Sequence, residues 1–238
     1  MPKTELTAFP RPSLAVDVAV LTVTTGRLAV VLWRRSGRTE TGRWALPGSF
    51  VQEREPLAHA VRRTLLTKCG IRGLSPTQLR VMDDPDRDSR GWVVSAAHLD
   101  VVRASALERR GPGDEVTLAP VRTSASTASA GSPARTRGRR QRSLLELPDS
   151  QDRLPFDHDE IVGLAIAELR GAYAERPDPH GLLGPRFTIL QLRRLHEAVA
   201  GEPIQKDTFR RTMLPHLEKL DEFEEGARGR PAHLYRHI

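Results

Sequence analysis

The sequence predicts an α/β domain followed by a second, mainly helical domain. Three observations support this division of the 238 residues. Apolar β-branched runs surround one amphipathic helix in residues 1–120. A segment rich in Ser and Arg then interrupts the pattern. After it come three helical patterns and a short hairpin pattern. We therefore assign an α/β domain to 1–120, a linker to 121–153 and a helical domain to 154–238.

The first strands are expected at residues 14–35, which read LAVDVAVLTVTTGRLAVVLWRR. Two β-branched runs flank Thr24-Thr25-Gly26, so the segment is typical of a hairpin with Gly26 in its turn. Both runs are apolar at nearly every position rather than at alternate ones. We therefore expect this hairpin to be buried on both faces.

A loop and a helix follow the hairpin. Pro47-Gly48 indicates the loop, Pro56 suits the first turn of a helix, and Gly70 is a typical residue for ending one. Two further strand-like runs lie at about 77–82 and 92–102, with the polar loop DDPDRDSRG between them. The apolar positions that recur at helical spacing are Leu57, Val61, Leu65 and Leu66.

The charge of the chain is concentrated in the predicted linker. The formal net charge is +7 and the pI is about 10.4. Residues 121–145 contain six arginines and no acidic residue. With no aromatic residue and few large apolar ones, this segment is typical of disorder. Two roles remain open for it: a solvated tether, or an auxiliary electrostatic contact to nucleic acid.

The composition also excludes several classes of protein. The single cysteine, Cys69, excludes an internal disulfide framework and a cysteine-rich zinc site. No apolar run approaches the roughly 20 residues of a membrane span. The first residues, MPKTELTAFPRPS, contain no apolar secretory signal. We therefore expect no membrane partner and a location in the cytoplasm.

The carboxy-terminal half starts with a helix expected over about 157–174. Asp157 is a suitable N-cap, and Asp159 and Glu160 fall in the first turn, where the helix dipole favours acids. Asp157, His158 and Asp159 together resemble part of a metal site. Capping explains the acids more simply, so we expect no metal here.

Two shorter helices and a hairpin pattern complete the chain. Thr188 and Gln191 have the spacing of a capping box, Gly201 ends the helix, and a second helix begins near Gln205. This order is typical of a winged helix-turn-helix, with the wing tip between Gly226 and Gly229. The predicted DNA-contacting residues are Lys206, Thr208, Arg210 and Arg211 on the second helix and Arg228 and Arg230 at the wing.

Residues 49–71 resemble the Nudix box, G-x5-E-x7-R-E-U-x-E-E-x-G-U, where U is aliphatic. The residues that match the pattern are Glu55, Arg63, Leu65, Gly70 and Ile71. In the enzymes of this family, the helix glutamates bind Mg²⁺. Thr64, Thr67 and Lys68 stand at those three positions here, and Ser49 replaces the first glycine. The resemblance therefore implies a retained fold without catalytic or metal-binding residues, and we do not expect an enzyme.

Such a domain can still bind a nucleotide without cleaving it. Arginines are available to pair with phosphates at positions 34, 35, 43, 87 and 90. Trp44 and Phe50 could stack on a base, although core packing is the simpler role for each. The candidate effector-binding residues are Arg35, Arg43, Trp44, Glu55, Arg63 and Arg90.

Taken together, the two halves resemble the Nudix-related transcriptional regulators of NAD metabolism, the NrtR family. Besides the degenerate box, the resemblance is carried by DPDRDSRGWVVS at 84–95, LPFDHDEI at 154–161, FTILQLRRLHEAV at 187–199, FRRTML at 209–214 and GRPAHLYR at 229–236. It implies a homodimeric bacterial repressor, associated with the nucleoid. Its Nudix-like domain would bind ADP-ribose and its winged helix a palindromic double-stranded DNA operator of NAD synthesis or salvage genes.

Two other functions remain open at this point. One is an active Nudix hydrolase of ADP-ribose-type substrates with an accessory DNA-binding domain. The other is a protein that holds nucleic acid by the basic linker rather than by the wing.

Overall fold

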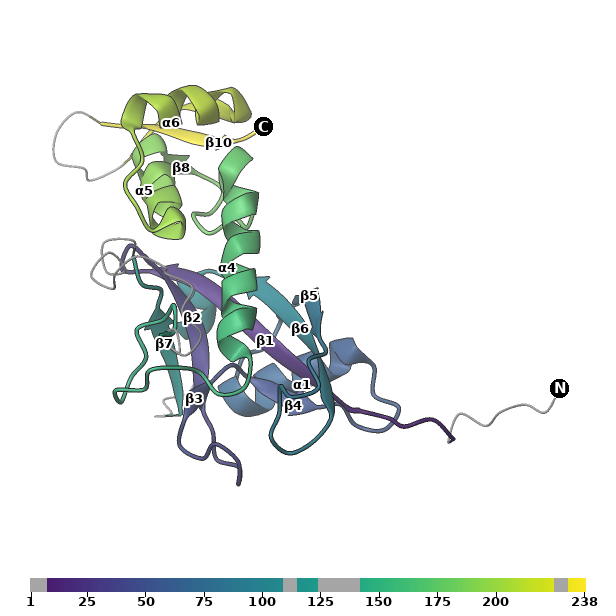
Figure 1. Ribbon diagram of the computed structural model, residues 1–238. Coiled ribbons are helices and arrows are strands. Elements are labelled where there is room, and N and C mark those ends of the chain that lie inside the picture. Colours follow the sequence, from purple (N-terminus) through teal and green to yellow (C-terminus); the bar gives the residue numbers. More distant parts are fainter. Residues whose placement is uncertain (1–7, 109–114, 124–141, 225–230) are drawn as a thin grey trace.

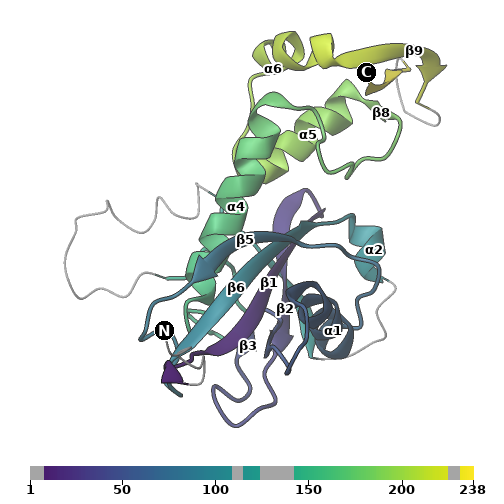
Figure 2. The same ribbon diagram turned by 90° about the vertical axis from the view of Figure 1, so that its right-hand side faces the viewer.

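The computed structural model describes residues 8–108, 115–123, 142–224 and 231–238. It has an α/β sandwich at one end and a small winged helix domain at the other, joined by a long helix (Figures 1 and 2). The predicted fold class is confirmed. Residues 124–141 of the predicted linker and residues 225–230 of the wing lie outside the described residues. The second range includes Arg228 and Arg230.

The hairpin at the start of the sandwich forms as predicted. Strand β1 (Ser13–Thr24) pairs antiparallel with β2 (Arg27–Arg34), and Thr24 lies opposite Arg27. The two turn residues, Thr25 and Gly26, have φ values of 49° and 72°. Positive φ at both positions is the geometry of a two-residue type I′ turn, so a glycine at the second position favours it.

The strand order of the sandwich depends on long-range pairing. The main path of the sheet is β3 (Trp44–Ala45), β2, β1, β6 (Val93–Val101) and β5 (Thr77–Met82), with β1 and β6 parallel. Two more strands join it: β4 (Gly48–Phe50) pairs with β1, and β7 (Val116–Pro120) pairs with β2. Strand β1 is therefore central, which explains its continuous apolar pattern.

Helices cover both faces of this sheet. On one face, α1 (Leu57–Cys69) packs Val61 and Leu65 into a cluster with the β1 and β2 side chains. The short helix α2 (Ala104–Glu108) adds Leu107 to the same cluster. On the other face, α4 (His158–Glu175) lies across the strands (Figure 2). The buried hairpin is thus the middle layer of a three-layer arrangement.

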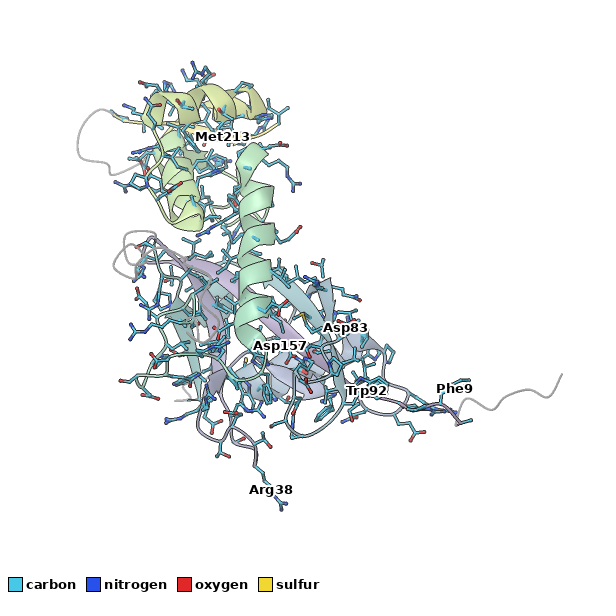
Figure 3. All side chains as sticks on the ribbon, viewed as in Figure 1. Phe9, Arg38, Asp83, Trp92, Asp157 and Met213 are labelled. Atoms are coloured by element: carbon cyan, nitrogen blue, oxygen red, sulfur yellow. The ribbon has the colours of Figure 1, made fainter. Side chains whose placement is uncertain are left out.

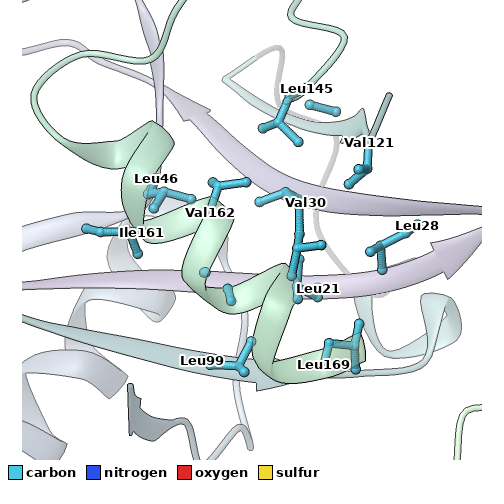
Figure 4. Packing of buried hydrophobic residues seen from close by; sticks show 14 of the residues in the cluster. Leu21, Leu28, Val30, Leu46, Leu99, Val121, Leu145, Ile161, Val162 and Leu169 are labelled. Carbon is cyan, nitrogen blue, oxygen red and sulfur yellow. The ribbon is translucent and has the colours of Figure 1, made fainter. Parts of the chain in front are cut away.

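Helix α4 belongs to the core of the sandwich. Its residues Ile161, Val162 and Leu169 pack against side chains such as Val30 and Leu99 of the sheet (Figure 4). The same cluster includes Leu195 and Val199 of the next helix. Helix α4 therefore packs in one apolar core with side chains of the sheet and of the next helix. It lies, however, in the 154–238 segment that we predicted as a separate domain.

Both ends of the predicted linker are packed rather than solvated. Val121 and Leu145 pair as an isolated β-bridge, and both are buried in the core beside α4. Arg27 of β2 donates two hydrogen bonds to the Glu146 carboxylate. The segment that follows β7 and the one that precedes α4 are therefore held together against the sheet.

The winged helix domain consists of two helices and a three-stranded sheet. Helix α5 (Ile189–Ala200) starts at the predicted capping box of Thr188 and Gln191 and ends at Gly201, whose φ is 80°. Helix α6 (Lys206–Met213) follows after a tight turn, and a 3-10 turn (Leu214–His216) leads to the sheet. The sheet order is β8 (Phe187–Thr188), β10 (His233–His237) and β9 (Leu217–Phe223).

The winged helix domain also contacts the sandwich directly. Arg103, which follows β6, donates from Nε to the Gly181 carbonyl at 2.6 Å. Arg170 of α4 donates to the Val199 carbonyl at 3.0 Å, and Tyr173 of α4 makes an edge-on contact with His196 of α5. Within the described part of the chain, no helix is long and apolar enough to cross a membrane.

Candidate functional site

A cavity of about 260 Å³ lies at the amino-terminal end of α4, where the sandwich, α1 and the segment before α4 meet. Asp157, labelled at the foot of α4 in Figure 3, precedes the first residue of that helix. The lining residues come from distant parts of the sequence: Ala15, Asp17, Arg35, Gly48, Ser49, Phe50, Lys68, Arg87, Asp88, Arg90, Val93, Phe156 and His158.

The cavity is cationic. Four of its lining side chains are Arg or Lys and two are Asp, which gives a formal charge of +2 with His158 neutral. Arg90 is paired with Asp88, and Arg87 with Asp17. Among the described residues, Arg35 has no carboxylate within 4.0 Å, and its Nε donates to the Thr39 carbonyl. Its guanidinium is thus available to a bound anion.

Asp17 of β1 organises the wall of the cavity. It accepts hydrogen bonds from Arg87 and Ser95, and Nε2 of His158 lies 3.3 Å from its Oδ1. The backbone N–H of Leu46 donates to Nδ1 of His158, so the ring proton is on Nε2 and faces Asp17. Burial would raise the pKa of the Asp17 carboxyl, but the interactions with His158, Arg87 and Ser95 hold it well below its usual range.

The close approach of Asp17 also explains Gly48. A Cβ atom at position 48 would lie 1.9 Å from Oδ1 of Asp17 and 3.0 Å from the Val16 carbonyl oxygen. Only glycine leaves room for this contact. Gly48, which the sequence predicts in a loop, therefore also makes room for the Asp17 carboxylate beside the cavity.

Asp17, Asp157 and His158 place their ligand atoms within 4.8 Å of one another, close enough to hold a metal ion. Arg87 occupies this position instead. Its guanidinium donates to the Asp17 carboxylate at 3.0 Å and to both oxygens of Asp157 at 2.6 and 2.7 Å. A cation already bridges the two carboxylates, so the cluster is a buried ion-pair network that fixes the start of α4.

The Nudix-box positions do not fit the Mg²⁺ of the enzymes. The Thr64 hydroxyl is buried, donates to the Ala60 carbonyl and lies 2.6 Å from the Ser49 hydroxyl. The hydroxyl of Thr67 donates to the Arg63 carbonyl, and Lys68 is cationic. Magnesium is held through carboxylates and water. Two hydroxyls bonded within the helix and an ammonium group do not make such a donor set.

Lys68 points to the cavity from α1. Its Nζ donates to the Gly48 carbonyl and lies 3.9 Å from the ring centroid of Trp33. Burial, together with the nearby positive charge of Arg35, lowers the pKa of the Lys68 ammonium to about 8. The ammonium group therefore supplies positive charge at one of the positions where the enzymes carry a metal-binding glutamate.

Two of the six predicted effector residues line this cavity, namely Arg35 and Arg90. The others are outside it. Arg43 pairs with Glu40 and donates to the Arg153 carbonyl. Trp44 is buried in the core, where its Nε1 donates to Asp149.

Glu55 and Arg63, the two charged residues that match the box pattern, form an ion pair at 2.7 Å. Hydrogen bonds from Arg63 and from the Gln52 backbone lower the pKa of the Glu55 carboxyl to about 2. Arg63 also donates to the Phe50 carbonyl. This pair braces the loop before α1 against the helix, so both residues have a structural role here.

Sequence reasoning missed several residues of the cavity. Lys68 was interpreted only as a lost metal ligand, and Phe50, expected in the core, is 41% exposed. Phe156 and His158 come from beyond the linker, so the local pattern carried no signal that they reach the sandwich. Asp17, an acid within an otherwise apolar strand, was the available signal, because a charge in a buried strand needs a partner.

A second candidate surface lies on the winged helix domain. Phe209 and Met213 of α6 are buried against α5, which leaves the opposite face of this helix exposed. Lys206, Thr208 and Arg211 are exposed, and Arg210 is half-buried. In the described part of the chain, no carboxylate lies within 4.0 Å of the three basic groups. The amino-terminal turn of α6 also contains one acid, Asp207.

Comparisons with known proteins match both ends of the chain. Residues 12–122 match the model of the NUDIX domain. Residues 179–237 match the model of the NrtR DNA-binding winged helix domain. A curated relative from Acinetobacter baylyi, named an ADPR responsive transcriptional repressor, is 28% identical over 236 residues. This alignment covers 96% of this chain and 83% of the relative.

Two solved structures resemble the whole chain. A MutT/nudix family protein from Enterococcus faecalis has a TM-score of 0.74 and 26% identity, covering 99% of this chain and 90% of the other. Shewanella oneidensis NrtR in complex with a 27-mer DNA has a TM-score of 0.70 and 27% identity, covering 94% and 93%. The two-domain architecture predicted from the sequence is therefore found intact in another protein.

Proposed function

We propose that this chain is a DNA-binding transcriptional repressor that responds to ADP-ribose or a related nucleotide. It joins a NUDIX domain to an NrtR DNA-binding winged helix domain and so belongs with the NrtR regulators. The observation that carries this proposal is the full-length match to a DNA-bound NrtR, which includes both domains and their connection. The Acinetobacter relative, matched over nearly the whole chain, is named an ADPR responsive transcriptional repressor, which also supports this proposal.

The DNA-binding surface in this proposal is the exposed face of α6. Lys206, Thr208, Arg210 and Arg211 would contact bases or phosphates in the major groove, as the second helix of such motifs does. Arg228 and Arg230 of the wing remain candidates for the adjacent groove. A homodimer would place two copies of α6 on the half-sites of a palindromic operator.

The ligand pocket in this proposal is the cationic cavity of the sandwich. Arg35, Lys68 and Arg90 would face the pyrophosphate, because guanidinium and ammonium groups form charge-assisted hydrogen bonds with phosphate oxygens. Lys68 would provide positive charge without a bound metal. We infer that this NUDIX domain binds its nucleotide without hydrolysing it, because Thr64, Thr67 and Lys68 do not fit Mg²⁺.

Two measurements test the proposal. Footprinting on the promoter upstream of the gene and on neighbouring promoters should show a protected palindrome. ADP-ribose should change the affinity of the protein for this palindrome. Arg210→Ala combined with Arg211→Ala should abolish this protection, and deletion of residues 124–141 should not. The reverse result would assign DNA binding to the basic linker.

The second measurement concerns the alternative function, an active hydrolase. Turnover of ADP-ribose is followed with Mg²⁺ in excess, beside a Nudix enzyme whose box is intact. We expect no turnover above the level of a buffer control. Catalysis comparable to that of the intact enzyme would contradict the non-catalytic part of the proposal and leave the DNA-binding part standing.

A further inference from the structure

Phe156 lines the cavity and contacts two of its arginines. The guanidinium carbon of Arg35 is 4.9 Å from the centroid of the Phe156 ring, and that of Arg90 is 5.4 Å from it. Arg90 also lies 4.9 Å from the ring of Phe50. The aromatic faces attract the cations, so the two rings and two guanidinium groups form a contiguous cluster at the cavity wall.

The backbone of Phe156 is held in an unfavourable conformation. Its φ is 57°, in the left-handed region where a bulky side chain is rarely found. Of the non-glycine residues with positive φ in the described part of the chain, Phe156 is the one that lines the cavity. Such a conformation persists only where the surrounding contacts hold it, and here they include the two cavity arginines.

The next two residues tie Phe156 to α4. Each carboxylate oxygen of Asp157 accepts a hydrogen bond from the Arg87 guanidinium, and His158 faces Asp17 through Nε2. Both residues are part of the buried ion-pair network, and His158 is the first residue of α4. A change in the backbone at Phe156 therefore acts on the start of this helix, with no flexible segment between them.

The other end of α4 contacts the winged helix domain. Tyr173 lies against His196 of α5, and Arg170 donates to the Val199 carbonyl. Figure 1 shows α4 extending from the sandwich to the winged helix domain as one continuous helix. A helix is stiff along its axis, so a shift at its foot changes the position of what is packed at its far end.

A nucleotide competes with Phe156 for the same groups. Phosphate oxygens form bidentate, charge-assisted hydrogen bonds with guanidinium groups, and these are stronger than contact with a ring face. The cavity also measures about 260 Å³, below the roughly 300–1,000 Å³ usual for organic ligands of this size. Phe156 lines the cavity, so movement of its ring would enlarge the space for a nucleoside diphosphate.

We propose that Phe156 couples the cavity to the DNA-binding domain: a pyrophosphate-containing nucleotide draws Arg35 and Arg90 from the ring, the residue leaves its left-handed conformation, and α4 repositions the winged helix domain. This inference rests on the proposed function and specifies how the ligand site regulates DNA binding. Binding of the nucleotide and of DNA is then reciprocal, because each ligand stabilises a different position of α4.

The test compares Phe156→Ala with Phe9→Ala, a control at an exposed phenylalanine that does not line the cavity. Calorimetry measures the ADP-ribose Kd of each full-length protein. Fluorescence anisotropy measures the operator Kd with and without saturating ADP-ribose. In wild type we expect this ratio of operator Kd values to be about 5–150, the usual range of allosteric coupling. Phe156→Ala should bring the ratio close to 1 while ADP-ribose binding is retained or strengthened, and Phe9→Ala should keep the wild-type ratio.

Phe156→Gly provides a second variant, since glycine adopts a φ of 57° without strain and preserves the backbone of this segment. Hydrogen exchange of the first turn of α4 should respond to ADP-ribose in wild type and not in either Phe156 variant. If wild type responds to ADP-ribose and the Phe156 variants respond equally, the coupling role of Phe156 is refuted and the proposed function stands. If wild type binds no ADP-ribose or no operator, the proposed function fails and this inference fails with it.

Discussion

The ammonium group of Lys68 lies 3.9 Å from the ring centroid of Trp33 and faces a cavity that carries net positive charge. Helix α1 thus presents a cation where the Nudix pattern has an acid. We predict that Lys68→Met raises the Kd for ADP-ribose at least about tenfold, which corresponds to about 1.4 kcal/mol and is within the range for a hydrogen bond to a charged group. Calorimetry checks this value. Lys219→Met, an exposed lysine of β9, is the control and should leave the Kd unchanged.

The pKa of Lys68 predicts how ligand binding depends on pH. The group is charged below its pKa of about 8 and neutral above it. A bound anion favours the charged form, so the affinity for ADP-ribose should be constant below pH 7 and should decrease as the pH rises from 8 to 9. Lys68→Arg, whose guanidinium stays charged, should bind equally at both pH values. A wild-type Kd that does not change between pH 7 and 9 would contradict this assignment.

Gly48 is predicted to tolerate no side chain. A Cβ would lie 1.9 Å from Oδ1 of Asp17, which faces His158, while Oδ2 of the same carboxylate is held by Arg87 and Ser95. Gly48→Ala should lower the free energy of unfolding by about 1–3 kcal/mol or more, in the range of overpacked cores. Gly37→Ala is the matched control, because no atom lies within 4 Å of the Cβ position there. Urea denaturation of both variants measures the difference.

The buried ion pairs of Arg87 predict a large loss of stability when this residue is removed. Its side chain is 3% exposed, and its loss leaves Asp17 and Asp157 without their cation. Breaking such a pair typically costs about 3–5 kcal/mol. Arg87→Ala should therefore unfold at much lower urea concentration than Arg90→Ala, whose partly exposed pair with Asp88 contributes less. Equal midpoints for the two variants would show that the network does not fix the start of α4.

The exposed face of α6 predicts a salt-dependent contribution to DNA binding. If Lys206 contacts a phosphate, Lys206→Ala should weaken operator binding and decrease the slope of log K against log salt by about 1. Arg72→Ala, an exposed arginine of the sandwich, should change neither quantity. Anisotropy titrations between 50 and 200 mM salt, taken as roughly the range where this effect is clear, make the measurement. An unchanged slope in Lys206→Ala would remove this residue from the interface.

Local patterns predicted most of the secondary structure. The hairpin around Gly26, helix α1 between Pro56 and Gly70, and the capping box of Thr188 are all confirmed within one or two residues. Each depends on groups that are neighbours in the chain, namely turn conformation, helical periodicity and capping hydrogen bonds. The cavity was predicted less well. Arg35 and Arg90 are in it, whereas Arg43 and Trp44 have other partners.

The sequence by itself determined the two domain types, their order and the replacement of the box glutamates by Thr64, Thr67 and Lys68. The tertiary structure decided which of the charged groups face one another. Asp17, Arg87 and Asp157 are far apart in the chain, and they meet because β1 pairs in parallel with β6 and α4 returns across the sheet. Pairing of this kind depends on burial and on long-range hydrogen bonds. No local pattern encodes the burial or the long-range hydrogen bonds, so the position of Phe156 at the cavity could not be predicted from the sequence.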